Sequence, residues 1–264
     1  MSRIHSHKAN VCNKEEISSI FQNTFFDGVI HLAAVSRVED AENDKEKCVQ
    51  VNYGGTKNIV DCIAKSPKTW MIFGSSREVY GEQEIFPVVE MTDLCPLNVY
   101  GHTKLEGEIL TQTLHKYMIL RFSNVYGNSY DRQERVIPTF VRQAKNNEPL
   151  ILHGGAQIID FTFIDDTIET IIRCINYLTV HEEVKEILHI SPGIENKLID
   201  VANIIVKQFK SKSQIIVEPM MKRQYDVVRF WGDSNKRKSL LGDNEFKSIT
   251  SGIKMMSANI DSVQ

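Results

Sequence analysis

The chain has 264 residues, of which 42% are hydrophobic and 25% charged, which is enough apolar material for one large globular domain or two small ones. Its formal net charge of −3 excludes a general basic surface for nucleic acid or for an anionic membrane. The five cysteines are scattered and lack CxxC spacing, so we expect neither structural zinc nor disulfides. The sequence has no apolar run of membrane-spanning length and no signal-peptide core, so we expect a cytoplasmic protein without a membrane anchor.

Short apolar runs alternate with longer helical segments in the first half of the chain. Nearly continuous apolar residues predict buried strands at Gly28–Ala34, at Thr69–Ser76 and in the first half of Tyr117–Gly127. Apolar residues at helical spacing predict helices over Cys48–Lys65 and Tyr100–Lys116 between these strands. The alternation of strand and helix is typical of a parallel sheet with helices on its faces.

The second half is less regular. We expect a helix that runs into a loop over Ile137–Leu150, a short strand feeding a helix over Phe161–Leu178, and an amphipathic helix over Leu198–Lys210. The predicted fold is therefore α/β, with a doubly wound parallel sheet in residues 1–127. Residues 128–264 are expected to form mainly a small C-terminal cap, together with the remaining strands of the sheet.

A tyrosine and a lysine stand one helical turn apart in VYGHTK, residues Val99–Lys104. Residues four apart lie on one face of a helix, so Tyr100 and Lys104 point the same way. A nearby ammonium stabilises a phenolate and makes a tyrosine usable as an acid or base. Ser76 follows a predicted buried strand and should emerge at the carboxyl edge of the sheet, where open α/β folds bind ligands. Ser76 could hydrogen-bond the oxygen on which Tyr100 acts.

Several motifs occur together in one order along the chain: HLAA, VNYGGTKN, SSREVYG, YGHTK, RFSNVYG and DFTFIDD. In this order they resemble the extended short-chain dehydrogenases/reductases, and within them the NAD-dependent epimerase/dehydratase family that acts on nucleotide sugars. The resemblance covers nearly the whole chain. It implies a Rossmann-like fold, NAD as cofactor, a nucleotide-sugar substrate, and a homodimer formed through the helix that carries Tyr100.

The resemblance also implies roles for individual residues. Tyr100 would be the acid/base, Lys104 would bind the nicotinamide ribose and tune Tyr100, and Ser76 would polarise the sugar 4-hydroxyl. The other implied site residues fall into two groups: Asn10, Val11, Ala33 and Ala34 would contact the cofactor, and Glu78, Asn124 and Arg229 would contact the substrate. No residues stand at metal-ligand spacing, so no metal is expected.

Two reactions of the resembled family stay open. Both begin with hydride transfer from sugar C4 to NAD, which gives a 4-keto intermediate; an epimerase then returns the hydride to the other face, whereas a 4,6-dehydratase eliminates water. Glu78 keeps the position of the eliminating base, but Arg77 stands where a dehydratase often has its acid. We therefore favour a nucleotide-sugar epimerase, with a dehydratase as the alternative.

One departure from the resembled family concerns the cofactor phosphates. Such proteins normally begin with a strand, a GxxGxxG turn and a helix that holds the pyrophosphate, yet this chain has no glycine before Gly28. We therefore expect a Rossmann-like domain truncated by roughly 60 residues. The strand that begins at Gly28 would then have an unpaired apolar edge. A non-catalytic member of the family that binds a partner or a sugar nucleotide is accordingly a further alternative.

Other positions carry opposing interpretations. Ile159 stands where the family often has a phosphate-binding arginine, so Arg229 would carry that role alone, unless it is a surface arginine packed on a neighbouring aromatic ring. Asp165 and Asp166 read as a helix start rather than a metal pair. His31 reads as a core histidine near the cofactor cleft rather than as a ligand.

Overall fold

The computed structural model describes residues 4–128, 131–219 and 223–261 and confirms the predicted mixed α/β architecture. The chain forms two compact units that interleave in sequence. The first unit comprises residues 1–81, 94–120 and 175–187, and the second comprises 82–93, 121–174 and 188–264. The predicted boundary at residue 127 separates a cofactor-binding part from a substrate-binding part. The two compact units are defined by packing alone, so this boundary stays a prediction. Within the described residues, no helix is both long and apolar enough to cross a membrane.

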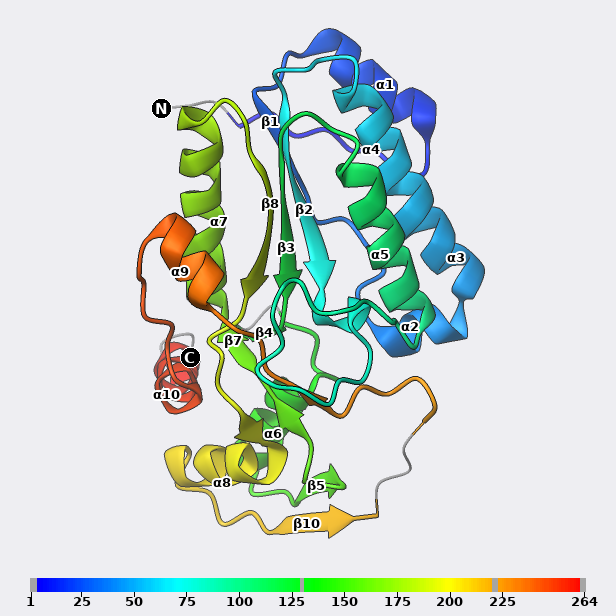
Figure 1. Cartoon of the computed structure of the whole chain (residues 1–264). Helices are drawn as coiled ribbons and strands as arrows, with labels where there is room; N and C mark the ends of the chain where they lie inside the picture. Colours follow the sequence, from blue (N-terminus) through cyan, green and yellow to red (C-terminus); the bar gives the residue numbers. More distant parts are fainter. Residues whose placement is uncertain (1–3, 129–130, 220–222, 262–264) are drawn as a thin grey trace. The chain divides into compact units, whose positions relative to one another are not determined.

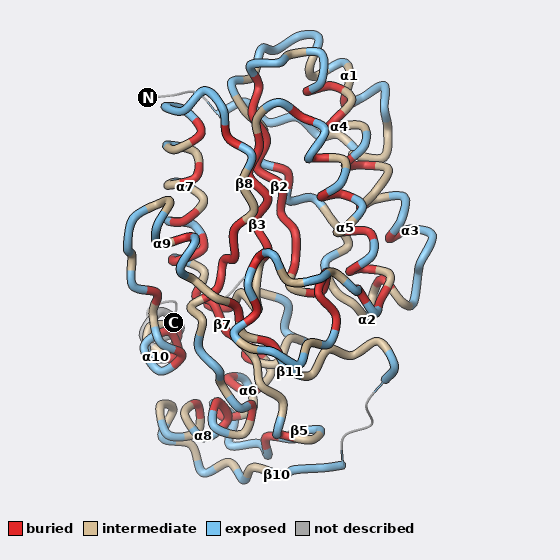
Figure 2. Tube along the Cα trace, viewed as in Figure 1, coloured by how far each residue is buried: buried red, intermediate tan, exposed pale blue. Residues whose placement is uncertain are grey.

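A four-stranded sheet has the strand order β1-β2-β3-β8 and includes the strand on which the Tyr100 helix packs. Its strands are β1 (Gly28–His31), β2 (Trp70–Ser76), β3 (Tyr117–Phe122) and β8 (Lys185–Ile190). β1 and β2 pair in parallel, with Gly28 opposite Trp70 and His31 opposite Phe73. Every residue of β2 is buried, which explains its continuous apolar run (Figure 2).

Helices cover one face of β1 and β2. Figure 1 shows α1 (Lys14–Asn23), α4 (Gly55–Ile63) and α5 (Val99–Thr111) side by side there. For α4 and α5 this follows from the strand order, because successive right-handed crossovers in one direction place their helices on one face, whereas α1 precedes β1 and packs on α4. The predicted helix over Cys48–Lys65 is interrupted: it consists of α3 (Lys45–Val49), the π-helical segment η1 (Gln50–Gly54) and α4. A short helix, α2 (Val38–Asn43), precedes them.

β1 is an edge strand within the described part of the chain, as predicted. It is shorter than predicted and is not buried along its whole length, since the Ile30 side chain remains 41% exposed. Leu32, just beyond the strand, is also exposed. The correction has a physical cause: β1 pairs on one side only, so fewer neighbours cover its side chains than cover those of β2.

The second unit has its own core around several helices and short strands. Its helices include α6 (Val136–Lys145), α8 (Leu198–Gln208), α9 (Asn235–Leu241) and α10 (Ile249–Asp261). Its strand pairs are β4 with β7 (Asn124–Tyr126 with Phe161–Phe163), β5 with β10 (Leu150–His153 with Ile215–Glu218), and β6 (Ile158–Ile159) between β9 (Asn196–Lys197) and β11 (Arg229–Phe230). α7 (Ile164–Val180) follows β7, which confirms the predicted strand-to-helix segment.

Close packing of α5 on β2 requires a glycine at position 107. A Cβ atom added there would lie 2.4 Å from Phe73 Cζ, whereas one added at Gly54 in η1 would meet nothing within 4 Å. We expect Gly107→Ala to lower the free energy of unfolding by about 1–2 kcal/mol, because overpacking outweighs the gain in helix propensity. The matched control Gly54→Ala should raise it by up to about 1 kcal/mol. Urea denaturation of both variants measures the two signs, and equal signs would contradict the packing argument.

Candidate active site

The catalytic pair predicted from VYGHTK lies on one buried face of α5. Tyr100 and Lys104 are both buried, and Lys104 Nζ is 5.8 Å from the centre of the Tyr100 ring. Lys104 Nζ donates a hydrogen bond of 2.6 Å to the carbonyl oxygen of Gly74 in β2 and lies over the Phe73 ring. The ammonium is therefore held between α5 and β2, near the Tyr100 ring.

Burial changes the acid–base behaviour of Lys104. Desolvation lowers the pKa of the ammonium to about 8, against the opposing effects of Cys48 and Glu108. Its charge is therefore present below about pH 8 and is lost above it. A lysine whose pKa lies so near neutrality is typical of a functional site and not of a surface ion pair.

Ser76 ends β2 and begins the short 3-10 helix η2 (Arg77–Val79), as predicted for a residue at the carboxyl edge of the sheet. Its Oγ accepts a hydrogen bond of 3.2 Å from the Glu78 backbone amide. The hydroxyl proton is thus available to donate to another oxygen. Ser76, Tyr100 and Lys104 all belong to the first compact unit.

A third polar side chain extends the buried face of α5, and sequence reasoning missed it. Glu108 is completely buried one turn beyond Lys104, and its carboxylate accepts a hydrogen bond from Ser75 Oγ. Tyr100, Lys104 and Glu108 therefore form a stripe at i, i+4 and i+8. That spacing is visible in the sequence and could have identified Glu108 as the counter-charge to the lysine.

Asn52 fixes the loop that carries Ala33 and Ala34. Its side chain accepts a hydrogen bond from Val35 N at 2.7 Å and donates to Val35 O at 3.1 Å and to Thr103 Oγ1 at 3.0 Å. The loop after β1 is thereby tied to α5. Ala33 is exposed and Ala34 half-buried, so the loop after β1 presents two small side chains that the protein does not fully cover. Sequence reasoning had placed Asn52 within a motif without assigning it this role.

Asn10 and Val11, the other predicted cofactor contacts, lie in a turn before α1. Val11 packs on Gly55, where an added Cβ would be 2.8 Å from Val11 Cγ2, and Asn58 Nδ2 donates to Val11 O at 2.9 Å. The turn is thus held on α4. His31 is buried and bonds Thr56 Oγ1 at 3.0 Å, and burial followed by the charge of Lys104 lowers its pKa to about 4, so it is a neutral core histidine as predicted.

Of the predicted substrate contacts, Glu78 is buried in the first unit, whereas Asn124 and Arg229 belong to the second. Asn124 begins β4. Arg229 is exposed, and its guanidinium lies 4.5 Å from the Phe86 ring centre and 5.0 Å from that of Trp231. The two rings are stacked at 4.3 Å. The packing partners of Arg229 are thus Trp231 and Phe86, and an exposed guanidinium held on rings keeps its N–H groups free for an anion.

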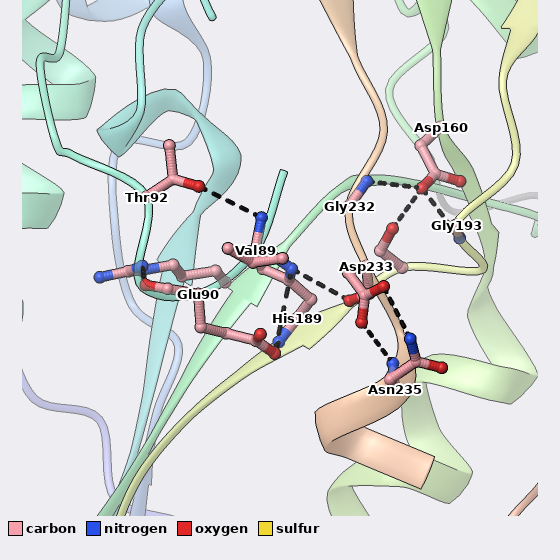
Figure 3. A network of polar contacts seen from close by, with 11 residues as sticks. Val89, Glu90, Thr92, Asp160, His189, Gly193, Gly232, Asp233 and Asn235 are labelled. Atoms are coloured by element: carbon pink, nitrogen blue, oxygen red, sulfur yellow. Dashed lines mark hydrogen bonds and ion pairs between the residues drawn. The ribbon is translucent and has the colours of Figure 1, made fainter. Parts of the chain in front are cut away.

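A polar network in the second unit supports the strand that carries Arg229 (Figure 3). The Asp160 carboxylate accepts hydrogen bonds from the amides of Gly193 at 3.0 Å and Gly232 at 3.3 Å, and burial raises its pKa to about 6. Glu90 accepts from the His189 amide at 3.0 Å. Asp160 therefore has a structural role in holding the 191–194 segment and Gly232 together.

The acidic residues at the start of α7 take part in a helix start and in an ion pair. Asp165 and Asp166 occupy the first turn of α7, as predicted, and Asp166 additionally pairs with Lys247 Nζ at 2.7 Å. Within the residues that the structure describes, no group of three or more His, Cys, Asp or Glu side chains could hold a metal ion. Ile159 is half-buried and packs against the core of the second unit, which suits an apolar side chain in place of arginine.

Comparison with known proteins identifies the family. The model of the NAD dependent epimerase/dehydratase family matches residues 2–187. The chain belongs to this family. A Methanocaldococcus jannaschii protein assigned as a UDP-glucose 4-epimerase is 30% identical, and the match covers 80% of this chain and 70% of that protein. The dTDP-D-glucose 4,6-dehydratase of Homo sapiens is 27% identical, over 84% of this chain and 63% of the human protein.

Solved structures confirm the Rossmann-type fold of the family. The UDP-glucuronic acid 4-epimerase of Bacillus cereus, solved with UDP-glucuronic acid and NAD, superimposes with a TM-score of 0.82 at 26% identity. The match covers 94% of this chain and 79% of that structure. Matches to two Arabidopsis thaliana enzymes cover smaller shares of those proteins, 36% for a match over 88% of this chain and 38% for a match over 48% of it. The predicted family and fold class are thus confirmed, while the roles of individual residues stay predictions.

Burial of the Lys104 ammonium predicts a specific dependence of stability on pH. Its folded-state pKa of about 8 lies below the ordinary value of 10.5, so the unfolded chain binds more protons between these values. Stability should therefore rise with pH across that window. Relative to Lys104→Met, the wild type should gain about 3 kcal/mol of unfolding free energy between about pH 7 and pH 11.

Urea denaturation at the two pH values measures this difference, with Lys68→Met as the control because Lys68 is exposed. The control should show no comparable change. A constant difference between wild type and Lys104→Met would contradict the lowered pKa.

Proposed function

We propose that this chain is a nucleotide-sugar 4-epimerase that works through a 4-keto intermediate. The observation that carries the proposal is the buried arrangement of Tyr100 and Lys104 on α5, which Lys104 ties to Gly74 near the end of β2, where Ser76 lies. Family membership supports the substrate class, since relatives named as epimerases and dehydratases act on UDP- or dTDP-sugars.

Each residue of the trio has a defined task in the proposed reaction. NAD, when bound, accepts and later returns the hydride of sugar C4. The Tyr100 phenol oxygen takes the proton of the 4-hydroxyl and gives it back to the same oxygen at the end of the cycle. The Lys104 ammonium favours the phenolate form of Tyr100, and the Ser76 hydroxyl donates to the sugar oxygen. No net proton or electron is gained over the cycle.

The surroundings of Glu78 favour epimerisation over dehydration. Elimination of water across C5 and C6 needs a base whose oxygen is open to the substrate. Both carboxylate oxygens of Glu78 are engaged, one by Arg77 Nη2 at 3.0 Å and the other by Asn98 Nδ2 at 2.8 Å. Arg77 stands at the position of the usual acid, and a guanidinium can donate hydrogen bonds but does not transfer a proton as a carboxylic acid does. These contacts support the epimerase over the dehydratase.

The residues present fit one end of NAD. Tyr100 and Lys104 are suited to the nicotinamide ribose, and the small side chains of Ala33 and Ala34 allow close approach of a flat group. Residues 4–27, in contrast, contain no glycine and therefore no GxxGxxG turn for the pyrophosphate. Tyr100 and Lys104 are accordingly proposed for the nicotinamide end and Asn10 and Val11 for the adenine end, while residues 4–27 offer no glycine turn to the pyrophosphate.

Direct measurement of cofactor and turnover tests the proposal. We expect the purified chain to bind NAD and to interconvert the C4 epimers of a UDP- or dTDP-sugar without releasing a 4-keto-6-deoxy product. Chromatography of the products separates the two reactions, and isothermal titration measures the binding of NAD. Release of a 4-keto-6-deoxy sugar would support the dehydratase alternative. Binding of the sugar nucleotide without NAD binding or turnover would support the non-catalytic one.

Removal of the Tyr100 hydroxyl should abolish turnover without loss of binding. We expect Tyr100→Phe to lower kcat by about 10²–10⁴-fold, the usual contribution of a general acid/base. Affinity for NAD and sugar nucleotide should change less than about threefold, since the ring and its packing remain. Tyr53→Phe in η1 is the control and should leave kcat unchanged. A Tyr100→Phe variant whose kcat stays within about tenfold of the wild type would exclude the proposed acid/base.

Arg229 is proposed as the contact for the substrate diphosphate. Charge-assisted hydrogen bonds to a phosphate are worth about 1.5–3 kcal/mol, so Arg229→Gln should weaken the binding of UDP by about 10–100-fold. Arg223→Gln is a matched control, because Arg223 also lies over a ring, that of Tyr225 at 4.9 Å. Titration with UDP at two salt concentrations measures both variants. Equal losses would show that the effect is one of general charge.

A further inference from the structure

The carboxylate of Glu78 is enclosed by protein groups. Glu78 is only 7% exposed, and its Oε1 is 3.0 Å from Arg77 Nη2 while its Oε2 accepts from Asn98 Nδ2 at 2.8 Å. Its backbone amide is also used, as the donor to Ser76 Oγ. Glu78 thus contacts residues at the start of α5 and at the end of β2, and its charge is already balanced by a neighbouring guanidinium.

Asn98 connects Glu78 to α5 by hydrogen bonds to both. As the N-cap residue, its Oδ1 accepts a hydrogen bond of 2.7 Å from the Gly101 amide. An amide side chain has one donor end and one acceptor end. Because Nδ2 is held by the Glu78 carboxylate, Oδ1 is turned toward the helix and the cap is fixed in the correct orientation.

The backbone of η2 also approaches the first turn of α5 closely. A Cβ at Gly101 would lie 2.6 Å from the Glu78 carbonyl oxygen, so only glycine allows this approach. Tyr100 stands between the two capped amides of that turn, since Val99 N donates to Glu42 Oε1 at 2.9 Å. Carboxylates at the N-terminus of a helix are also favoured by its dipole.

We propose that Glu78 is a positioning residue, which acts through Asn98 to fix the first turn of α5 and hence the Tyr100 phenol, and that it is not a base acting on the substrate. This inference rests on the proposed role of Tyr100. It replaces the substrate contact that the family resemblance implies for Glu78. Glu78 and Asn98 therefore form one functional unit with the catalytic helix.

Substitution of Glu78 in two backgrounds, the wild type and Asn98→Ser, tests whether Glu78 acts through Asn98. Serine caps a helix well but has no amide to be oriented, so Asn98→Ser uncouples the cap from Glu78. In the wild-type background we expect Glu78→Ala to lower kcat by about 10–100-fold with little change in KM, as misplacement of a reacting group does. In the Asn98→Ser background the same substitution should cost less than about threefold.

The conservative variant and a control sharpen the test. The side-chain oxygen of Glu78→Gln can still accept from Asn98, so this variant should keep kcat within about tenfold of the wild type. Glu106→Ala, on the exposed face of the same helix, should change nothing. Loss of about 10³-fold or more in Glu78→Gln, or an equal cost of Glu78→Ala in both backgrounds, would show that Glu78 acts on the substrate and overturn the inference.

A readout without substrate keeps this test separate from the proposed function. Hydrogen exchange of the Gly101 amide, followed by NMR in the substrate-free chain, reports the cap directly. We expect Glu78→Ala to speed this exchange about tenfold in the wild-type background and not in the Asn98→Ser background. Unchanged exchange would refute the positioning role even in an active enzyme. Absence of turnover in the wild type would refute the epimerase proposal and leave the exchange result intact.

Discussion

A single buried ammonium constrains the geometry of the candidate site. Lys104 Nζ donates to the Gly74 carbonyl at 2.6 Å and thereby joins the middle of α5 to the carboxyl end of β2. A buried cation without partners would be lost by deprotonation, so its surroundings must supply compensation. The Gly74 oxygen, the Phe73 ring at 5.1 Å and the negative charge of Glu108 do so in part, and the remaining desolvation appears as the lowered pKa. Tyr100, one turn earlier, is fixed relative to Ser76 by this link.

The need to bring α5 so close to β2 explains several residue choices. Gly107 lies against the Phe73 ring, and Gly101 lies against the backbone of η2. Neither glycine is in a left-handed conformation, so what they provide is the absence of a side chain and not backbone freedom. Glycines in the middle of a helix cost stability, which is tolerable here because the packing fixes the Tyr100–Lys104 pair on the sheet.

The part of this geometry that could be predicted from sequence is the part encoded by short-range periodicity. Spacing of four residues placed Tyr100 and Lys104 on one face, and continuous apolar runs identified β2 and β3. Their burial and the tie to Gly74 depend on contacts between segments about 30 residues apart, which no local pattern specifies. The π-helical segment η1 was missed for the same reason, since Asn52 within it is held by bonds to Val35 and Thr103.

Sequence reasoning reached its limit at Glu78, because identical residue types serve different roles according to what surrounds them. A glutamate after a strand in a motif of this family can be read as a base or as a substrate contact. The contacts of its carboxylate with Arg77 and with Asn98 support a third role, in which the carboxylate binds other groups of the protein. A carboxylate without protein partners is available to act on a substrate. A carboxylate that orients a helix cap would have to break that hydrogen bond first, and the cap would lose its orientation. The role proposed for Glu78 thus rests on its hydrogen-bond partners and not on its residue type.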